Sequence, residues 1–180
     1  MMLAIKSNVI AFLFFILAKV SLYLDKMKSK IYDLKEVKSR IRFYCAKEDR
    51  CQQQVIDKLL DFGLNIVVSE EILLELIHEK YVDEERYARS FCSGKFKIKK
   101  WGRRKIIFEL KKKRVSEVCI QKGLEEIDEA AYLYTLQQLL EKKKNLTKDT
   151  NQFILKKKMV DYVVRKGYES DLVWEAVDKL

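Results

Sequence analysis

The sequence contains no proline and only five glycines among its 180 residues. These are the two residue types that most often end helices or form sharp turns, so their scarcity favours helices. Hydrophobic residues make up 48% of the chain and charged residues 36%, a composition typical of a folded protein and not of a disordered tail. We therefore expect an all-α fold.

Residues that bind metals or act as nucleophiles are scarce. His78 is the only histidine, and the four cysteines, Cys45, Cys51, Cys92 and Cys119, include no C-x-x-C pair, so the spacing of a structural zinc site is missing. We expect reduced, partly buried thiols and an exposed His78. A phosphate-binding G-x-x-x-x-G-K-S/T loop is also missing. The sequence therefore predicts no enzyme activity, cofactor, metal site or small-molecule substrate.

One hydrophobic run, VIAFLFFILA, occupies residues 9–18. It is shorter than the about 20 apolar residues that span a bilayer. Three interpretations compete: a signal peptide or membrane anchor, a packed N-terminal helix, and an over-extended start with Met27 as the true initiator. We favour the third, because the periodic and charged part of the chain begins directly after Met27. Residues 1–26 are accordingly treated as an extension.

The positive charge is concentrated in one window. The chain carries a formal net charge of +10, and between Gly94 and Arg114 eleven basic residues stand against the single acid Glu109. This window therefore accounts for the whole excess, and the rest of the chain sums to zero. A concentrated excess creates a local field that attracts a polyanion, whereas a scattered one serves only solubility.

Three ten-residue segments align without gaps, at 55–64, 106–115 and 159–168. They lie 51 and 53 residues apart, and apolar residues recur at their positions 1, 5 and 10. This spacing predicts a helix in each segment. Another amphipathic stretch precedes each one, at about 34–46, 84–96 and 128–143. Aromatic residues on these stripes, including Tyr132, Tyr162 and Trp174, are expected in the core.

The end of each aligned segment and the start of the helix after it carry matching signals. The ninth position is glycine in the first and third segments and arginine in the second. Glycine suits the left-handed residue that ends a helix. A serine follows each segment and is predicted to cap the next helix. These positions are Gly63, Arg114 and Gly167, and then Ser69, Ser116 and Ser170.

These signals predict three tandem copies of a three-helix unit. The boundaries follow the aligned segments and lie at 27–82, 83–127 and 128–180. A unit of this size buries little apolar surface alone, so neighbouring units should pack against each other into an elongated, bent rod.

Two stretches resemble the RecX family. The first stretch resembles the family's first-repeat motif and reads YCAKEDRCQQQVIDKLLDFG (44–63). The second resembles the family's central signature, which is an acidic pair before R-Y-A, a basic stretch, a glycine and an I-x-x-E-L helix. It reads YVDEERYARSFCSGKFKIKKWGRRKIIFELKKKRVS (81–116). The FKIKKWGRRKI portion is similar to Bacteroidetes members in particular. Glu84 and Arg114 depart from the usual aspartate and glycine. The resemblance covers residues 33–180 and leaves out the N-terminal extension, which supports a later start.

The resemblance implies a regulatory protein that binds RecA and lies in the helical groove of the filament that RecA forms on single-stranded DNA. Such a protein interferes with filament growth, ATP turnover, strand exchange and co-protease activity, and so acts in DNA repair, recombination and the SOS response. We also expect a monomer and, from the reduced cysteines, a cytoplasmic protein.

The basic window is the candidate surface for DNA and the filament. Its lysines can neutralise phosphates, and Trp101 or Phe108 can stack on an unpaired base. In a helix over 103–114, apolar residues fall on one side and basic residues group around Phe108 on the other. The candidate residues are Lys95, Lys97, Lys99, Lys100, Trp101, Arg103, Arg104, Lys105, Lys111 and Lys112.

Alternatively, Trp101 and Phe96 lie in the core and the lysines form a solvated face. Exposed charges contribute little to stability, so replacing Lys97, Lys99, Lys100, Arg103 and Arg104 should leave the fold nearly untouched.

The alternative function is a transcriptional regulator of the helix-turn-helix type, which reads base sequence in the major groove. A recognition helix normally offers Asn, Gln, Ser or Thr beside arginine, whereas this central helix offers almost only lysine, arginine and apolar residues. This composition favours contact with the DNA backbone. A membrane-tethered helical protein is a third possibility, and it depends on retention of residues 9–18.

Overall fold

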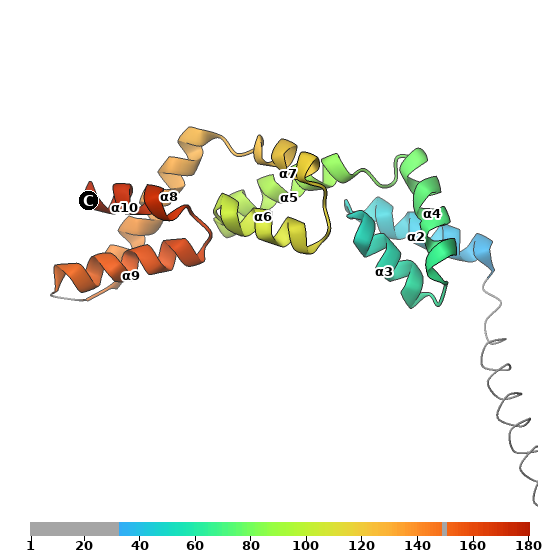
Figure 1. Cartoon of the computed structure of the whole chain (residues 1–180), viewed down its shortest axis with the longest axis horizontal. Coiled ribbons are helices and arrows are strands. Elements are labelled where there is room, and N and C mark those ends of the chain that lie inside the picture. Colours follow the sequence, from blue (N-terminus) through green and yellow to red (C-terminus); the bar gives the residue numbers. More distant parts are fainter. Residues whose placement is uncertain (1–32, 149–150) are drawn as a thin grey trace, which may run out of the picture. The chain divides into compact units, whose positions relative to one another are not determined.

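The computed structural model describes residues 33–148 and 151–180, and over these residues it contains nine helices and no strand (Figure 1). The all-α prediction is confirmed. Every contact described below lies within one compact unit, residues 39–180. The hydrophobic run and Met27 lie outside the described residues. Among the described helices, none is long and apolar enough to cross a bilayer.

The helices follow one another in groups of three. The first repeat comprises α2 (Leu34–Lys47), α3 (Gln52–Asp61) and α4 (Ile66–His78); the second, α5 (Glu84–Lys99), α6 (Arg103–Lys112) and α7 (Glu117–Leu124); the third, α8 (Glu129–Leu146), α9 (Gln152–Arg165) and α10 (Ser170–Asp178). The last helices of the repeats begin 51 and 53 residues apart, which is the separation of the aligned segments. The three-helix repeat is confirmed.

The left-handed residue predicted after each middle helix is present in all three repeats. The φ angles are 88° at Gly63, 58° at Arg114 and 94° at Gly167. Only glycine adopts such angles without a steric penalty. The second repeat therefore makes the same chain reversal with a residue that is less suited to it.

None of the three serines makes the predicted side-chain capping bond, and only Ser116 stands at an N-cap position. Ser69 lies inside α4, fully buried, where its hydroxyl donates to the Asn65 carbonyl at 2.8 Å. The N-cap of α4 is Asn65 itself, because asparagine accepts a backbone N–H at least as well as serine and stands earlier in the chain. Ser116 is the N-cap residue of α7 but makes no side-chain capping bond, and Ser170 is already inside α10.

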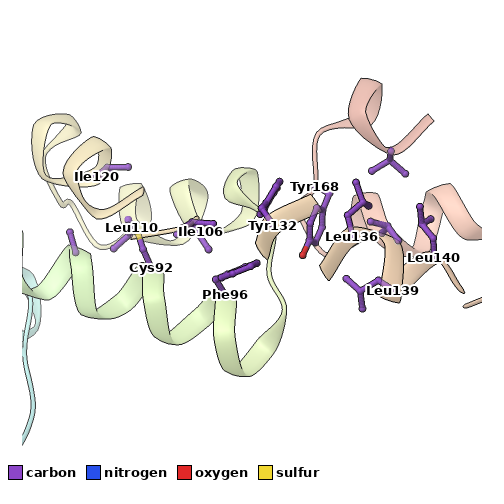
Figure 2. Close-up of a cluster of buried hydrophobic side chains, with 14 of the residues drawn as sticks. Cys92, Phe96, Ile106, Leu110, Ile120, Tyr132, Leu136, Leu139, Leu140 and Tyr168 are labelled. Atoms are coloured by element: carbon purple, nitrogen blue, oxygen red, sulfur yellow. The ribbon is translucent and has the colours of Figure 1, made fainter. Parts of the chain in front are cut away.

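The buried side chains of the second and third repeats form one continuous cluster. Figure 2 shows Cys92, Phe96, Ile106, Leu110 and Ile120 of the second repeat near Tyr132, Leu136, Leu139, Leu140 and Tyr168 of the third. The two repeats therefore share a core, and neither of them buries its apolar residues alone.

Most of the expected core residues are buried. All four cysteines are free; Cys119 is half-buried and the other three are buried. Burial raises the pKa of the Cys92 thiol to about 12, so this cysteine packs as a neutral, small hydrophobe. His78 is exposed, as expected. Trp174 was expected in the core but is 40% exposed, because α10 buries Val173 and Val177 and the neighbouring position points away from them.

Within the described residues, no group of three or more His, Cys, Asp or Glu side chains lies close enough together to hold a metal ion.

In each of the first two repeats, an ion pair joins the first helix to the residues just after the last helix. In the first repeat, Arg42 donates from Nε and Nη2 to the two carboxylate oxygens of Glu79, at 2.8 and 2.7 Å. In the second repeat, Arg89 donates to Glu126 at 2.8 Å. The partners of both pairs are 37 residues apart in the chain. The geometry differs, because Arg42 makes both bonds to Glu79, whereas Arg89 divides its donors among Glu85, Glu125 and Glu126.

The second and third repeats meet backbone to backbone at Gly102 and Gly167. The Gly102 N–H donates to the Lys166 carbonyl at 2.9 Å, and the Arg104 N–H donates to the Gly167 carbonyl at 3.0 Å. A Cβ on Gly102 would overlap the backbone of Gly167, and a Cβ on Gly167 would overlap Lys105. Only glycine fits at these two positions.

Alanine at either of these glycines should destabilise the protein. We expect Gly102→Ala and Gly167→Ala each to lower the free energy of unfolding by about 1 to 3 kcal/mol, because the added methyl forces the two backbones apart. Gly94→Ala is the matched control: it lies within α5, and a Cβ there meets nothing within 4 Å. It should raise the unfolding free energy by about 0.5 to 1 kcal/mol. Urea unfolding measures all three, and equal stabilities would contradict the close approach of the two backbones.

Candidate nucleic-acid interface

The basic corner, which we define as residues 95–105, joins α5 to α6. The left-handed cap of α5 is Lys100, with φ 55°, and Gly102 is the N-cap of α6. Lys97, Lys99, Lys100 and Arg104 are exposed. Within residues 33–148 and 151–180, the structure pairs none of these four with an acidic side chain. The corner therefore presents unneutralised positive charge to solvent.

The first turn of α6 is capped by the third repeat. The first N–H groups of a helix lack partners within the helix, and Gly102 has no side chain to accept from them. The Tyr132 hydroxyl accepts the Arg103 N–H at 3.1 Å, and the Gly167 carbonyl accepts the Arg104 N–H. Because these N–H groups are occupied, phosphates at this corner must be bound by side chains and not by the helix N-terminus.

Tyr132 in α8 holds the junction together. Its buried ring stacks on Tyr168 with 4.7 Å between centroids and packs against Phe96 at 5.8 Å (Figure 2). Its hydroxyl donates to Glu169 at 2.7 Å. Burial, and then this hydrogen bond, raise the pKa of the Tyr132 phenol far above its usual value. The hydroxyl therefore stays protonated, and it donates to Glu169 while it accepts from α6.

Arg103 serves the fold more than the surface. Its guanidinium carbon lies 4.2 Å from the centroid of the Tyr132 ring, and the same group pairs with Glu129. The side chain is only 25% exposed. The expectation that replacing the whole cluster leaves the fold untouched therefore does not hold at Arg103. Sequence spacing could not show this, because its partners come from the next repeat.

Trp101 lies half-buried against the shared core. The ammonium groups of Lys95 and Lys105 lie 5.4 and 4.8 Å from its ring centroid, within the range of cation–π attraction. Two of the lysines predicted to bind DNA therefore point toward the Trp101 ring. Base stacking by Trp101 stays a prediction, and the structure gives the ring other neighbours.

The remaining part of the cluster lies along α6. Ile106 and Leu110 are fully buried, whereas Phe108 is 64% exposed, so the two predicted faces of this helix are present. Lys111 pairs with Glu117 at 2.8 Å, and Lys112 is exposed. The predicted residues that the structure leaves exposed and without an ion pair among the described residues are Lys97, Lys99, Lys100, Arg104 and Lys112.

A cavity of about 400 Å³ lies beside the basic corner, and α5 and the loop between α2 and α3 contribute most of its lining. The basic residues Arg50, Lys95, Lys99 and Lys113 line it together with the acids Glu48 and Asp49. Basic residues therefore outnumber acidic ones on its walls, and both acids are paired with arginines, Glu48 with Arg50 and Asp49 with Arg86. Lys99 lies both on this wall and among the exposed cations of the basic corner.

Arg103 and Arg104 are adjacent and should respond differently to substitution. We expect Arg103→Ala to lower the free energy of unfolding by about 1 to 2 kcal/mol, because it removes the cation from the Tyr132 ring. Arg104→Ala should change it by less than about 0.5 kcal/mol, because this side chain is exposed. Thermal melts followed by circular dichroism give both values, and equal melting midpoints would contradict a structural role for Arg103.

Comparison with protein-family models finds two matches. Residues 83–124 match the second three-helix domain of RecX, and residues 131–177 match its third three-helix domain. These ranges contain the basic corner and the junction with the third repeat.

Known proteins and structures give the same result. The regulatory protein RecX of Bacillus cytotoxicus is 26% identical over 137 residues, which cover 76% of this chain and 51% of the relative, and that of Bacillus mycoides is 25% identical with the same coverage. The chain thus spans about half the length of the curated relatives it matches.

The crystal structure of RecX from Lactobacillus salivarius superposes with a TM-score of 0.74, at 20% identity, over 82% of this chain and 96% of that one. A second RecX crystal structure superposes with a TM-score of 0.74, at 19% identity, over 81% of this chain and 71% of that one. Residue motifs, domain matches, relatives and fold agree, and the chain belongs to the RecX family.

Proposed function

We propose that this protein regulates RecA by binding the filament that RecA forms on single-stranded DNA, and that it does so without catalysing a reaction. The observation that carries the proposal is the basic corner: exposed cations, with no acidic partner among the described residues, on a backbone that the third repeat holds in place. A fixed array of cations attracts a polyanion and supplies an affinity that depends on salt.

The composition of α6 supports contact with the backbone of DNA more than reading of bases in a duplex. Its ten residues, RRKIIFELKK, include no Asn, Gln, Ser or Thr, the residue types that usually accompany arginine at base edges. Its N-terminal N–H groups are also occupied by the third repeat. We therefore prefer a filament regulator to a transcriptional regulator of the helix-turn-helix type.

The proposal includes a monomer that needs no cofactor or small-molecule substrate and works in the cytoplasm, the compartment that holds bacterial DNA and RecA. Gel filtration and cell fractionation test these points directly. A membrane fraction enriched in the protein would favour the anchor interpretation of residues 9–18.

Purified protein should slow RecA-dependent ATP hydrolysis and strand exchange when it is present well below the RecA concentration, because one regulator bound in a filament affects many RecA subunits. It should hydrolyse nothing by itself. A pull-down against RecA filaments on single-stranded DNA, with free RecA and bare DNA as controls, identifies the partner. An intrinsic ATPase or nuclease activity that a point mutation abolishes would contradict the proposal.

The basic corner should set the salt dependence of binding to single-stranded DNA. We expect the triple variant K97A/K99A/K100A to bind more weakly at low salt and to flatten the plot of log affinity against log salt by about 0.7 for each phosphate that the variant no longer neutralises. The control variant K142A/K148A/K157A removes the same charge from exposed positions of the third repeat. If both variants change the slope equally, net charge and not the corner determines binding.

A further inference from the structure

The exposed side of α6 carries one aromatic residue among cations. Arg104, Phe108 and Lys112 are four residues apart and so form a line along the helix, with a rise of about 6 Å from each to the next. All three are exposed, whereas Ile106 and Leu110 on the opposite side are fully buried. The three side chains therefore project into solvent together.

The ring of Phe108 is uncovered, in contrast to that of Phe43 in α2. Both phenylalanines are 64% exposed, but the Lys47 ammonium lies 4.4 Å from the centroid of the Phe43 ring. Among the described residues, no cation or second ring lies over Phe108. Its basic neighbours Lys105 and Lys111 are directed elsewhere, to Trp101 and Glu117.

We propose that Phe108 is the side chain on which an unpaired base of single-stranded DNA stacks, with Arg104 and Lys112 binding the phosphates on its two sides. This inference rests on the proposed binding of single-stranded DNA and deepens it by naming the stacking residue. Phe108 suits this role better than Trp101, which is half-buried against the core and has two lysines over its ring.

Charge complementarity identifies the occupant as nucleic acid. An apolar protein surface on Phe108 would bury Arg104 and Lys112 without partners, which is costly. A single strand instead offers a phosphate to each cation and a π face to the ring. Glu109, the one acid of α6, lies about 100° around the helix from Phe108 and so does not face the strand. A paired base has both faces covered by its neighbours, so stacking on the ring requires an unpaired one.

The test compares Phe108→Ala with the matched control Phe43→Ala in the full chain. The probe is a fluorescein-labelled oligothymidine, and a duplex of equal length serves as the second ligand. We expect Phe108→Ala to weaken binding to the single strand by about 5- to 150-fold, with little change for the duplex. The salt slope should be unchanged, because every cation that binds a phosphate is still present. Phe43→Ala should bind as wild type, and Phe108→Tyr should retain most of the affinity.

The cations on either side of the ring are distinguished from it by the salt dependence of binding. Arg104→Ala and Lys112→Ala should each flatten the salt slope by about 0.7, which Phe108→Ala should not do. Circular dichroism checks that each variant is folded, since substitutions at exposed positions leave stability nearly unchanged.

The possible results separate the two proposals. If K97A/K99A/K100A weakens binding to the oligonucleotide and Phe108→Ala does not, the stacking role is wrong and the basic corner stands. If Phe108→Ala weakens single-strand and duplex binding equally, or Phe43→Ala has the same effect, the stacking role is also wrong. A wild-type chain that binds no oligothymidine at low salt overturns both the stacking role and direct DNA binding.

Discussion

The backbone N–H groups in the first turn of α6 have no acceptors within the helix, and the structure of the basic corner depends on the acceptors they find elsewhere. The N-cap of α6 is a glycine without a capping side chain, so the N–H groups of Arg103 and Arg104 find their acceptors in the third repeat. Glycine is nevertheless required, because any larger residue would separate the backbones that make these bonds. The capping that a serine or aspartate supplies within most helices is here an interaction between repeats.

This arrangement divides the cations of the basic window into two groups. Some are held by neighbours: Arg103 by Tyr132 and Glu129, Lys105 by Trp101, and Lys111 by Glu117. Others, at the end of α5 and along the outer side of α6, remain exposed without an ion pair among the described residues. The first group fixes the direction of the chain at the corner, and the second supplies the field at its surface. Replacing Arg103 therefore removes contacts within the fold, whereas replacing Arg104 removes charge from the surface.

The features that the sequence predicted correctly are local. Periodicity placed the helices, the repeat and the buried side of α6, and the ninth position of each aligned segment predicted the left-handed residues, including Arg114. The cap of α4 was missed because Asn65 and Ser69 are both good N-cap residues and their order of preference does not separate them. Tyr132 and Glu169 could not be assigned to the junction, because their partners are 29 and 37 residues away along the chain. The residues that bind DNA stay a prediction, since residue type alone does not show where a cation is directed.

Capping between repeats also has a consequence for protein synthesis. The acceptors for the first turn of α6 are Tyr132 and Gly167, so they are translated after α6 itself. At about 5 to 20 residues per second, several seconds pass between the appearance of Gly102 and that of Gly167. During this interval the nascent chain already carries the basic residues but lacks the groups that order them. The surface proposed to meet the filament is therefore completed among the last steps of folding, and a chain that ends within α9 would carry the basic charge without the Lys166 and Gly167 carbonyls that hold the corner.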